Sequence, residues 1–320
     1  MTPPVPARRS GWPTHAMPSQ ANAGAAAAEI THEFGPWKVA CRADDGGRIS
    51  RLAWRGTELL TAAPVRFTPP HADYGRYELR PVYAYDDCWP SVAACRYPGT
   101  SGSVPDHGEL CWLPWQFTHT ATTLVCRVDS AALPVSFART LDFRADRVTW
   151  RFRIENHGDT PLPCLHVMHP LLPLTAMRAL ELPAFTSAVD ATRACVRPET
   201  SEAAIAAFLL DRPRGTATML FLQGVREGRC AFVRHDGLRL DMQFPADRFP
   251  TLGIWWNHLG YPDEDGCRRD ECAFEPVSAQ NSNLADATQS GAGIRLEPGE
   301  RFEWECEWRV SPATPIRCHT

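Results

Sequence analysis

Apolar and polar residues alternate with a period of two over most of this chain of 320 residues. The alternation is clearest in the segments VTWRFRIEN (148–156), LRLDMQF (238–244) and RFEWECEWRV (301–310). Successive side chains of a β-strand point to opposite faces, so this pattern is typical of strands with one buried and one exposed face. It favours antiparallel sheets, whose outer faces can meet water.

Turn residues separate these segments. His235-Asp236-Gly237 predicts a tight hairpin between 230–234 and 238–244. EPGE at 297–300 predicts a turn that leads from AGIRL (292–296) into the last strand. Only 201–210 is a good helical candidate after the N-terminal segment. Many strands, with 29 prolines in the chain, predict an all-β fold: a large antiparallel β-sandwich with few short helices.

We divide the chain into three parts. Residues 1–29 are rich in Pro, Ala, Ser and Gly without periodicity, so we expect a disordered leader. This stretch has no hydrophobic core of a secretion signal, which favours a cytoplasmic protein. Residues 30–312 show no linker and no internal repeat and are expected to form a single domain. Residues 313–320 are a C-terminal tail.

Composition excludes several classes of function. The net charge of −4 leaves no basic footprint for nucleic acid. No apolar run reaches the ~18 residues that span a membrane, so we expect no membrane partner. The twelve cysteines contain no C-x-x-C pair. We interpret them as reduced, buried small hydrophobes, with no metal site and no structural disulfide. A monomer or a homodimer is expected.

Four stretches combine polar residues of catalytic type with aromatic residues. They are DDCWPSV (86–92), PDHGELCWLPW (105–115), CLHVMHPLLPL (164–174), and LGIWWNHLGYP (252–262), which leads into CAFEPVSAQNSNLADA (272–287). Each singled-out residue also has a structural interpretation. His107 suits a turn, His169 could cap a strand end, the pair Asp86-Asp87 is often solvated, and an isolated Glu275 is more often structural than catalytic.

In combination, these stretches resemble the galactose mutarotase-like (aldose 1-epimerase) superfamily over about residues 30–312. GGRISRLAWRGTELL (46–60) resembles its opening hairpin, and PDHGELCW (105–112) its His-Gly segment. ENHGDTPLPCLHVMHPLL (155–172) resembles the strands that carry its catalytic histidine. CAFEPVSAQNSNLADA resembles the strand that carries its base, and IRLEPGERFEWECEWRV (294–310) its closing hairpin. The resemblance implies a β-supersandwich with a sugar cleft on its concave face.

The resemblance also implies a reaction: exchange of the α and β anomers of a sugar by ring opening. Glu275 would be the base that takes the proton from the C1 hydroxyl, and His169 the acid that protonates the ring oxygen. His107 would bind sugar hydroxyls. Asp87, Trp89, Trp256 and Asn257 are further candidates for sugar contacts, and Trp112 is an alternative stacking residue. No metal or organic cofactor is implied.

Two departures concern the substrate. An early arginine of the galactose mutarotases is replaced here by Asp86 or Asp87, and the arginine that follows His-Gly in the hexose-6-phosphate branch is replaced by Glu109 and Leu110. A neutral hexose is therefore favoured over its phosphate. The alternatives are a hexose-6-phosphate 1-epimerase and a non-catalytic carbohydrate-binding supersandwich. Glycoside hydrolases and lyases with such domains usually carry an added helical domain, for which the chain has no room.

Overall fold

A computed structural model describes residues 29–63, 77, 82–261 and 269–313. It is 51% strand and 8% helix, with several antiparallel sheets, so the all-β prediction is confirmed. The leader up to residue 28 and the tail from residue 314 lie outside the described residues. Within the described ranges, no helix is long and apolar enough to cross a membrane.

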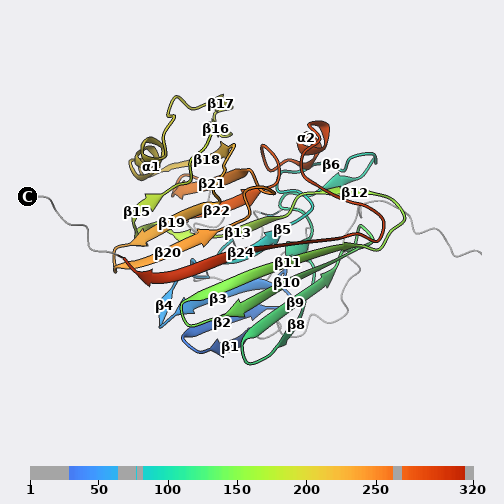
Figure 1. Cartoon of the computed structure of the whole chain (residues 1–320), viewed down its shortest axis with the longest axis horizontal. Coiled ribbons are helices and arrows are strands. Elements are labelled where there is room, and N and C mark those ends of the chain that lie inside the picture. The colour runs from blue at the N-terminus through green and yellow to red at the C-terminus, as the bar shows by residue number, and fades with distance from the viewer. Residues whose placement is uncertain (1–28, 64–76, 78–81, 262–268, 314–320) are drawn as a thin grey trace, which may run out of the picture.

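The largest sheet has eight antiparallel strands and runs across the front of Figure 1. Its strands are, in spatial order, β15 (Met177–Glu181), β19 (Arg229–Arg234), β20 (Leu238–Gln243), β24 (Arg301–Pro312), β11 (Arg147–Asn156), β10 (Val135–Phe143), β9 (Thr123–Asp129) and β8 (Gln116–His119). The hairpin predicted at His235–Gly237 is confirmed, since β19 pairs with β20 across it.

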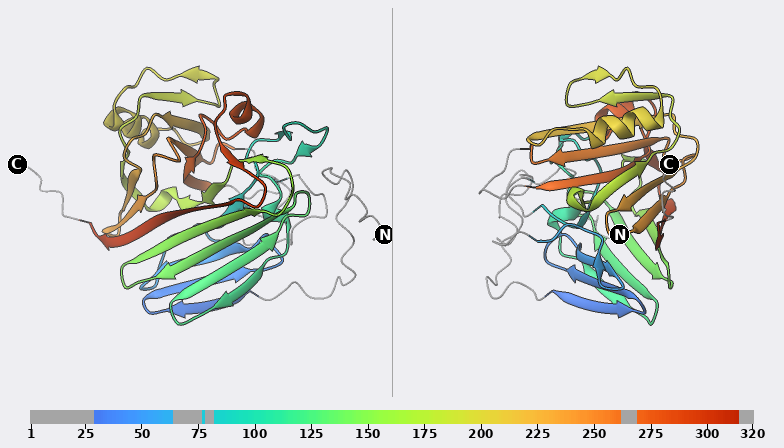
Figure 2. Two further views of the ribbon diagram at one scale, coloured as in Figure 1. Left: turned by 45° about the vertical axis from the view of Figure 1, so that its right-hand side comes forward. Right: turned by 90° about the vertical axis from the view of Figure 1, so that its left-hand side faces the viewer.

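A six-stranded sheet packs behind the eight-stranded one. It contains β1 (Ile30–Phe34), β2 (Trp37–Arg42), β3 (Arg48–Trp54), β5 (Tyr85–Cys88) and β13 (Val167–Pro170), with β4 (Thr57–Glu58) beside β3. Figure 2 (right) shows the blue strands β1–β3 and the green strands β8–β11 as two layers. The pairing of β3 with β4 confirms the opening hairpin.

A second six-stranded sheet continues from the first. It contains β14 (Leu172–Pro173), β22 (Asp270–Val277), β21 (Thr251–His258), β18 (Thr216–Gln223), β16 (Ser187–Asp190) and β17 (Cys195–Val196). Only Leu171 separates β13, which pairs with β5, from β14, which pairs with β22. One short chain segment therefore belongs to both six-stranded sheets and carries His169 at their junction.

The remaining elements are short. They are the strand pairs β6 (Cys95–Arg96) with β7 (Ser103–Val104) and β12 (Leu162–Cys164) with β23 (Ile294–Leu296), the 3₁₀ helices η2 (Leu110–Trp112) and η3 (Leu174–Ala176), and the helices α1 (Glu202–Leu210) and α2 (Leu284–Gln289). The predicted helix is confirmed as α1, and α2 was not predicted. The turn at 297–300 does not close a hairpin, because β23 pairs with β12 while β24 pairs with β11 and β20.

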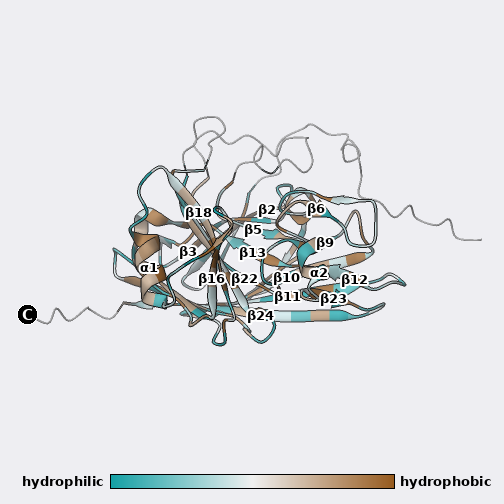
Figure 3. Cartoon of the chain, turned by 90° about the horizontal axis from the view of Figure 1, so that it is seen from above, coloured by the Kyte–Doolittle hydropathy of each residue, from teal (hydrophilic) through white to brown (hydrophobic). Residues whose placement is uncertain are grey.

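The period of two recurs as burial. In β11, Val148, Trp150, Phe152 and Ile154 are buried, while the residues between them are exposed or partly exposed. Figure 3 shows the same alternation as hydrophilic and hydrophobic bands along β24. Eight of the ten cysteines in the described part of the chain are buried, which confirms the interpretation of most of them as core residues.

A buried ion pair connects the two layers of the sandwich. The Asp87 carboxylate on β5 accepts hydrogen bonds from Arg139 on β10, from Tyr85 at 2.6 Å and from a ring nitrogen of His166 at 3.0 Å. Arg139 also donates to the Gly47 carbonyl at 2.6 Å. Both charged side chains are fully buried. This network connects the two layers through the core, where a paired and hydrogen-bonded charge is tolerated.

Candidate functional site

The structure brings His169 and Glu275 together. His169 lies on β13 and Glu275 on β22, in the two adjoining six-stranded sheets. Nε2 of the imidazole lies 3.8 Å from Oε1 of the carboxylate. This distance is too long for a hydrogen bond. The side chains are 7% and 3% exposed, so both titratable groups face each other in a place largely shielded from water.

Asp86 fixes the orientation of His169. The two residues are opposite each other in the β5–β13 register, and Nδ1 of the imidazole lies 2.9 Å from Oδ1 of Asp86. Nε2 is therefore the nitrogen turned toward Glu275. Burial lowers the pKa of His169, but the hydrogen bond and charge of Asp86, with the charges of Glu275 and Glu271, outweigh it and raise the pKa above its ordinary value.

Arg48 stands behind Asp86. Its guanidinium lies 3.4 Å from Oδ2 of Asp86 and donates to Asp45 at 2.7 Å and to the Tyr83 carbonyl at 2.6 Å. The side chain is fully buried on β3. The Asp86 carboxylate thus lies between Arg48 and His169, and its negative charge favours the imidazolium form of His169.

The surroundings of Glu275 make its carboxylate more basic than an exposed one. Burial raises the pKa of its carboxyl group, and the charge of Asp86 adds to this, while His169 and His107 lower it. Gly253 lies directly opposite on β21. A Cβ at this glycine would lie 3.3 Å from Oε2 of Glu275 and 3.0 Å from the Met219 methyl group. The missing side chain therefore leaves room for the carboxylate.

His107 reaches the same cluster from a loop. His107 and Gly108 both have positive φ angles, of 59° and 70°. A Cβ at residue 108 would lie 1.9 Å from the Trp89 carbonyl oxygen, so only glycine fits. This close contact places the His107 ring with its centroid 5.1 Å from that of His169.

Tyr77 covers both imidazoles. Its ring stacks on His107, with centroids 3.6 Å apart and planes at 7°. Its hydroxyl donates to Oδ2 of Asp86 at 3.0 Å and lies 3.2 Å from Nδ1 of His169. Sequence reasoning missed Tyr77, because the residue stands in a stretch without periodicity.

Two residues predicted to contact the sugar point to the other face. Asp87 faces the sandwich interior and is held by Arg139, while its neighbour Asp86 faces His169. Trp256 is buried, while its neighbour Trp255 is partly exposed and donates to Glu271 at 3.4 Å. Asp87 and Trp256 therefore lie on the faces of β5 and β21 opposite to those that carry Asp86 and Gly253, so the two predicted sugar contacts face away from the cluster.

The other two predicted sugar contacts have structural roles. Trp89 is fully buried, and its backbone bridges Gly108 and accepts from the Glu109 amide at 2.8 Å. Asn257 is fully buried, and its carbonyl oxygen accepts from the amides of Gly260 at 3.0 Å and Tyr261 at 2.9 Å. Trp89 therefore supports the His107 loop, and Asn257 closes the turn after β21. Trp112 is partly buried in η2.

Glu271 is a second carboxylate on the same face. It shares β22 with Glu275 and lies opposite Asn257. Burial raises the pKa of Glu271, and Arg269, 3.5 Å away, and His169 lower it. In the sequence, the spacing of four between Glu271 and Glu275 on one strand was the available signal for a shared face.

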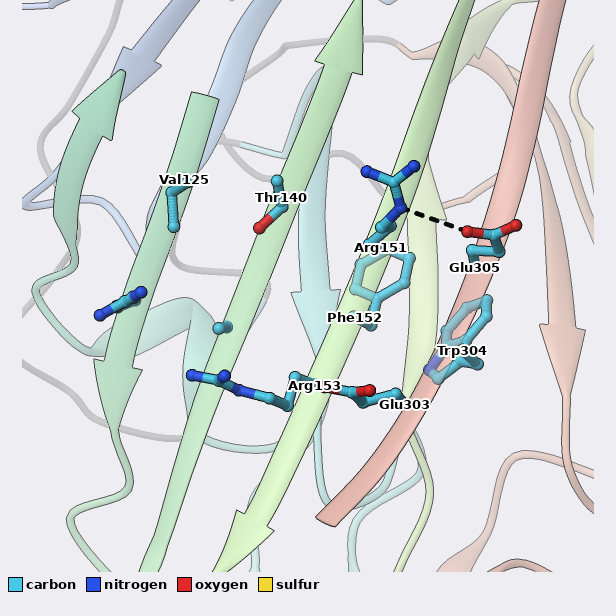
Figure 4. Close-up of a pocket in the computed structure, with 10 residues that line it drawn as sticks. Val125, Thr140, Arg151, Phe152, Arg153, Glu303, Trp304 and Glu305 are labelled. Atoms are coloured by element: carbon cyan, nitrogen blue, oxygen red, sulfur yellow. Dashed lines mark hydrogen bonds and ion pairs between the residues drawn. The ribbon is translucent and has the colours of Figure 1, made fainter. Parts of the chain in front are cut away.

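A hollow also lies on the outer face of the eight-stranded sheet, away from this cluster. Arginines of β9 and β11, such as Arg151 and Arg153, line it together with Glu303 and Glu305 of β24, and β10 contributes Ala138 and Thr140 (Figure 4). Arg151 pairs with Glu305 at 3.3 Å. Among the described residues that line it, no histidine stands beside a carboxylate as His169 stands beside Glu275.

No protein-family model and no curated protein matches the chain. Solved structures do. The Slr1438 protein from Synechocystis sp. PCC 6803 is similar at a TM-score of 0.66 and 17% identity, over 89% of this chain and 96% of that one. An Escherichia coli K12 protein named as a candidate aldose 1-epimerase has a TM-score of 0.64 and 17% identity, over 89% and 99%. A galactose mutarotase related enzyme from Lactobacillus acidophilus has a TM-score of 0.65 and 14% identity, over 90% of this chain and 98% of that one.

Proposed function

We propose that this chain, which has the galactose mutarotase-like fold, is an aldose 1-epimerase that exchanges the anomers of a neutral hexose. The observation that carries the proposal is the pair His169 Nε2 and Glu275 Oε1, 3.8 Å apart and largely buried, with the other imidazole nitrogen held by Asp86. Names of structural neighbours agree with it but belong to proteins of low identity.

The pair suits ring opening of a cyclic hemiacetal. The C1 hydroxyl oxygen and the ring oxygen are bonded to the same carbon, so a base and an acid a few ångströms apart can each reach one of them at ~2.6–3.2 Å. Glu275 takes the hydroxyl proton while His169 protonates the ring oxygen, and the bond between C1 and the ring oxygen breaks. Rotation of the aldehyde and reclosure give the other anomer.

Polarimetry tests the activity directly. Purified protein added to fresh α-D-glucose or α-D-galactose should speed the change in optical rotation in proportion to its concentration. Binding of a sugar without any acceleration would favour the non-catalytic carbohydrate-binding alternative. If no aldohexose is bound and none mutarotates faster, both the epimerase proposal and the carbohydrate-binding alternative are wrong.

We expect a neutral hexose to bind more tightly than its 6-phosphate. Among the described residues near the cluster, Arg48 is buried against two aspartates, and Arg269 lies beside Glu271. Glu109, where the phosphate branch has arginine, is buried and bonded to Ser130 and the Ala131 amide. Calorimetric titration with glucose and glucose 6-phosphate measures the preference, and tighter binding of the phosphate would contradict it.

The tryptophan pair on β21 offers a matched test of substrate contact. Trp255→Ala should raise KM about tenfold with little change in kcat, because stacking and burial of one sugar face contribute ~1 kcal/mol or more. Trp256→Phe should lower the melting temperature and leave KM unchanged, since Trp256 lies in the core. A KM change in the Trp256 variant alone would reverse the two roles.

A further inference from the structure

A cysteine completes the surroundings of the two histidines. Cys88 is buried on β5, two residues after Asp86 and on the same face of the strand. The thiol sulfur and one ring nitrogen each of His107 and His169 all lie within 4.8 Å of one another. Ligands about 2.0–2.3 Å from a tetrahedral zinc ion stand roughly 3.3–3.8 Å apart. Small side-chain rotations therefore bring these three atoms to metal-ligand spacing.

The groups around the cluster match a metal site in two further ways. Nδ1 of His169 is hydrogen-bonded to Asp86 at 2.9 Å, and a carboxylate in this position orients an imidazole whose other nitrogen binds a metal. Asp106 lies 3.0 Å from Nδ1 of His107 without a hydrogen bond, and its negative charge adds to the attraction of the site for a cation. In addition, Oε1 of Glu275 lies 3.8 Å from Nε2 of His169, which places a fourth ligand within reach.

We propose that Cys88, His107 and His169 bind one thiophilic divalent cation of the zinc class, with Glu275 as the fourth ligand. Thiolate and imidazole ligands select zinc over magnesium and calcium. The thiol proton leaves to solvent as the cation binds. This site departs from the expectation of no metal, which rested on sequence spacing: its ligands come from β5, the His-Gly loop, β13 and β22, and no short motif unites them.

The cation would also block the proposed reaction. It occupies Nε2 of His169 and Oε1 of Glu275, the two atoms that exchange protons with the sugar. Zinc should therefore inhibit competitively with the hexose, and this part of the proposal rests on the proposed function. The binding itself does not, since it is measured by spectroscopy without any turnover.

Cobalt(II) is the probe. Titration of the whole chain with Co²⁺ should give one equivalent with tetrahedral ligand-field bands and a thiolate-to-cobalt charge-transfer band, and Zn²⁺ should abolish both. Mg²⁺ should leave the spectrum unchanged. Cys88→Ala should lose the charge-transfer band and weaken Zn²⁺ binding by more than the ~10–100-fold cost of losing an outer-shell partner.

Cys195→Ala is the matched control, because Cys195 is an exposed free thiol outside the cluster. It should bind Co²⁺ like the unaltered chain. If Cys88→Ala fails to fold, as judged by circular dichroism, Cys88→Ser and His107→Gln serve instead, and each should weaken binding. Three results would overturn the site: a charge-transfer band that persists in the Cys88 variants, a band that is lost in Cys195→Ala, or no band in the unaltered chain at saturating Co²⁺.

Discussion

Glu275→Gln and His169→Asn should each slow the exchange of hexose anomers by about 10²-fold or more, while hexose binding falls far less. The first change keeps the shape of the side chain and removes the base, and the second keeps a polar group and removes the acid. General acid–base groups typically contribute ~10²–10⁴-fold each. Polarimetry gives the rates, and calorimetric titration gives the sugar affinity.

The double variant should be little slower than either single one, since residues that act as a unit are not additive. Glu305→Gln and His157→Asn are matched controls on the surface and should keep the full rate. A folded Glu275→Gln protein with the unaltered rate would falsify the assignment of the base. If the single variants instead lost only stability, the cluster would be a structural polar network.

Arg139→Met should lower the free energy of unfolding by about 3–5 kcal/mol, because it leaves the buried Asp87 carboxylate without its cation. The Arg139 guanidinium also lies over the rings of Trp115 and Tyr85, with its central carbon 4.9 and 5.0 Å from their centroids. Urea denaturation followed by circular dichroism measures the loss. Adding Asp87→Asn to Arg139→Met should recover part of it.

Arg151→Met is the matched control on β11. Its side chain is about half exposed and pairs with Asp142 and Glu305, so its loss should cost less than ~1 kcal/mol. Equal losses from both arginine variants would contradict the buried network.

Burial raises the pKa of Asp87, but Arg139 and His166 outweigh this effect and hold the pKa below its ordinary value. The stabilisation by Asp87 is therefore full above the ordinary carboxyl range and is lost as the pH falls through the lowered pKa.

The period of two accounts for what could be predicted of the fold. It identified β11, β20 and β24, and with turn residues it located the β19–β20 hairpin. It does not specify which strands pair across long distances. The turn at 297–300 illustrates this: the chain reverses there as predicted, but β23 and β24 join different partners. The short helix α2 has only six residues, too few for a helical period to emerge.

The same period explains the partial success at the site. His169, Glu275 and His107 were named from family resemblance and lie together, whereas Asp87 and Trp256 were each chosen one residue away from the neighbour that faces the cluster. A shift of one residue moves a side chain to the opposite face of a sheet. All four residues of β5 are buried, so the strand has no alternation of buried and exposed positions. The sequence pattern therefore could not show whether Asp86 or Asp87 faces the core.

The face-to-face arrangement of His169 and Glu275 makes the proposed catalytic cycle self-contained for protons. Ring opening moves one proton from the C1 hydroxyl to Glu275 and one proton from His169 to the ring oxygen. Ring closure on the other face moves both protons back, so the enzyme ends in the form in which it started. No proton has to enter from or leave to the solvent, from which both side chains are largely shielded. Turnover should therefore be indifferent to buffer concentration at constant pH, in contrast to spontaneous mutarotation, which draws its acids and bases from the solution.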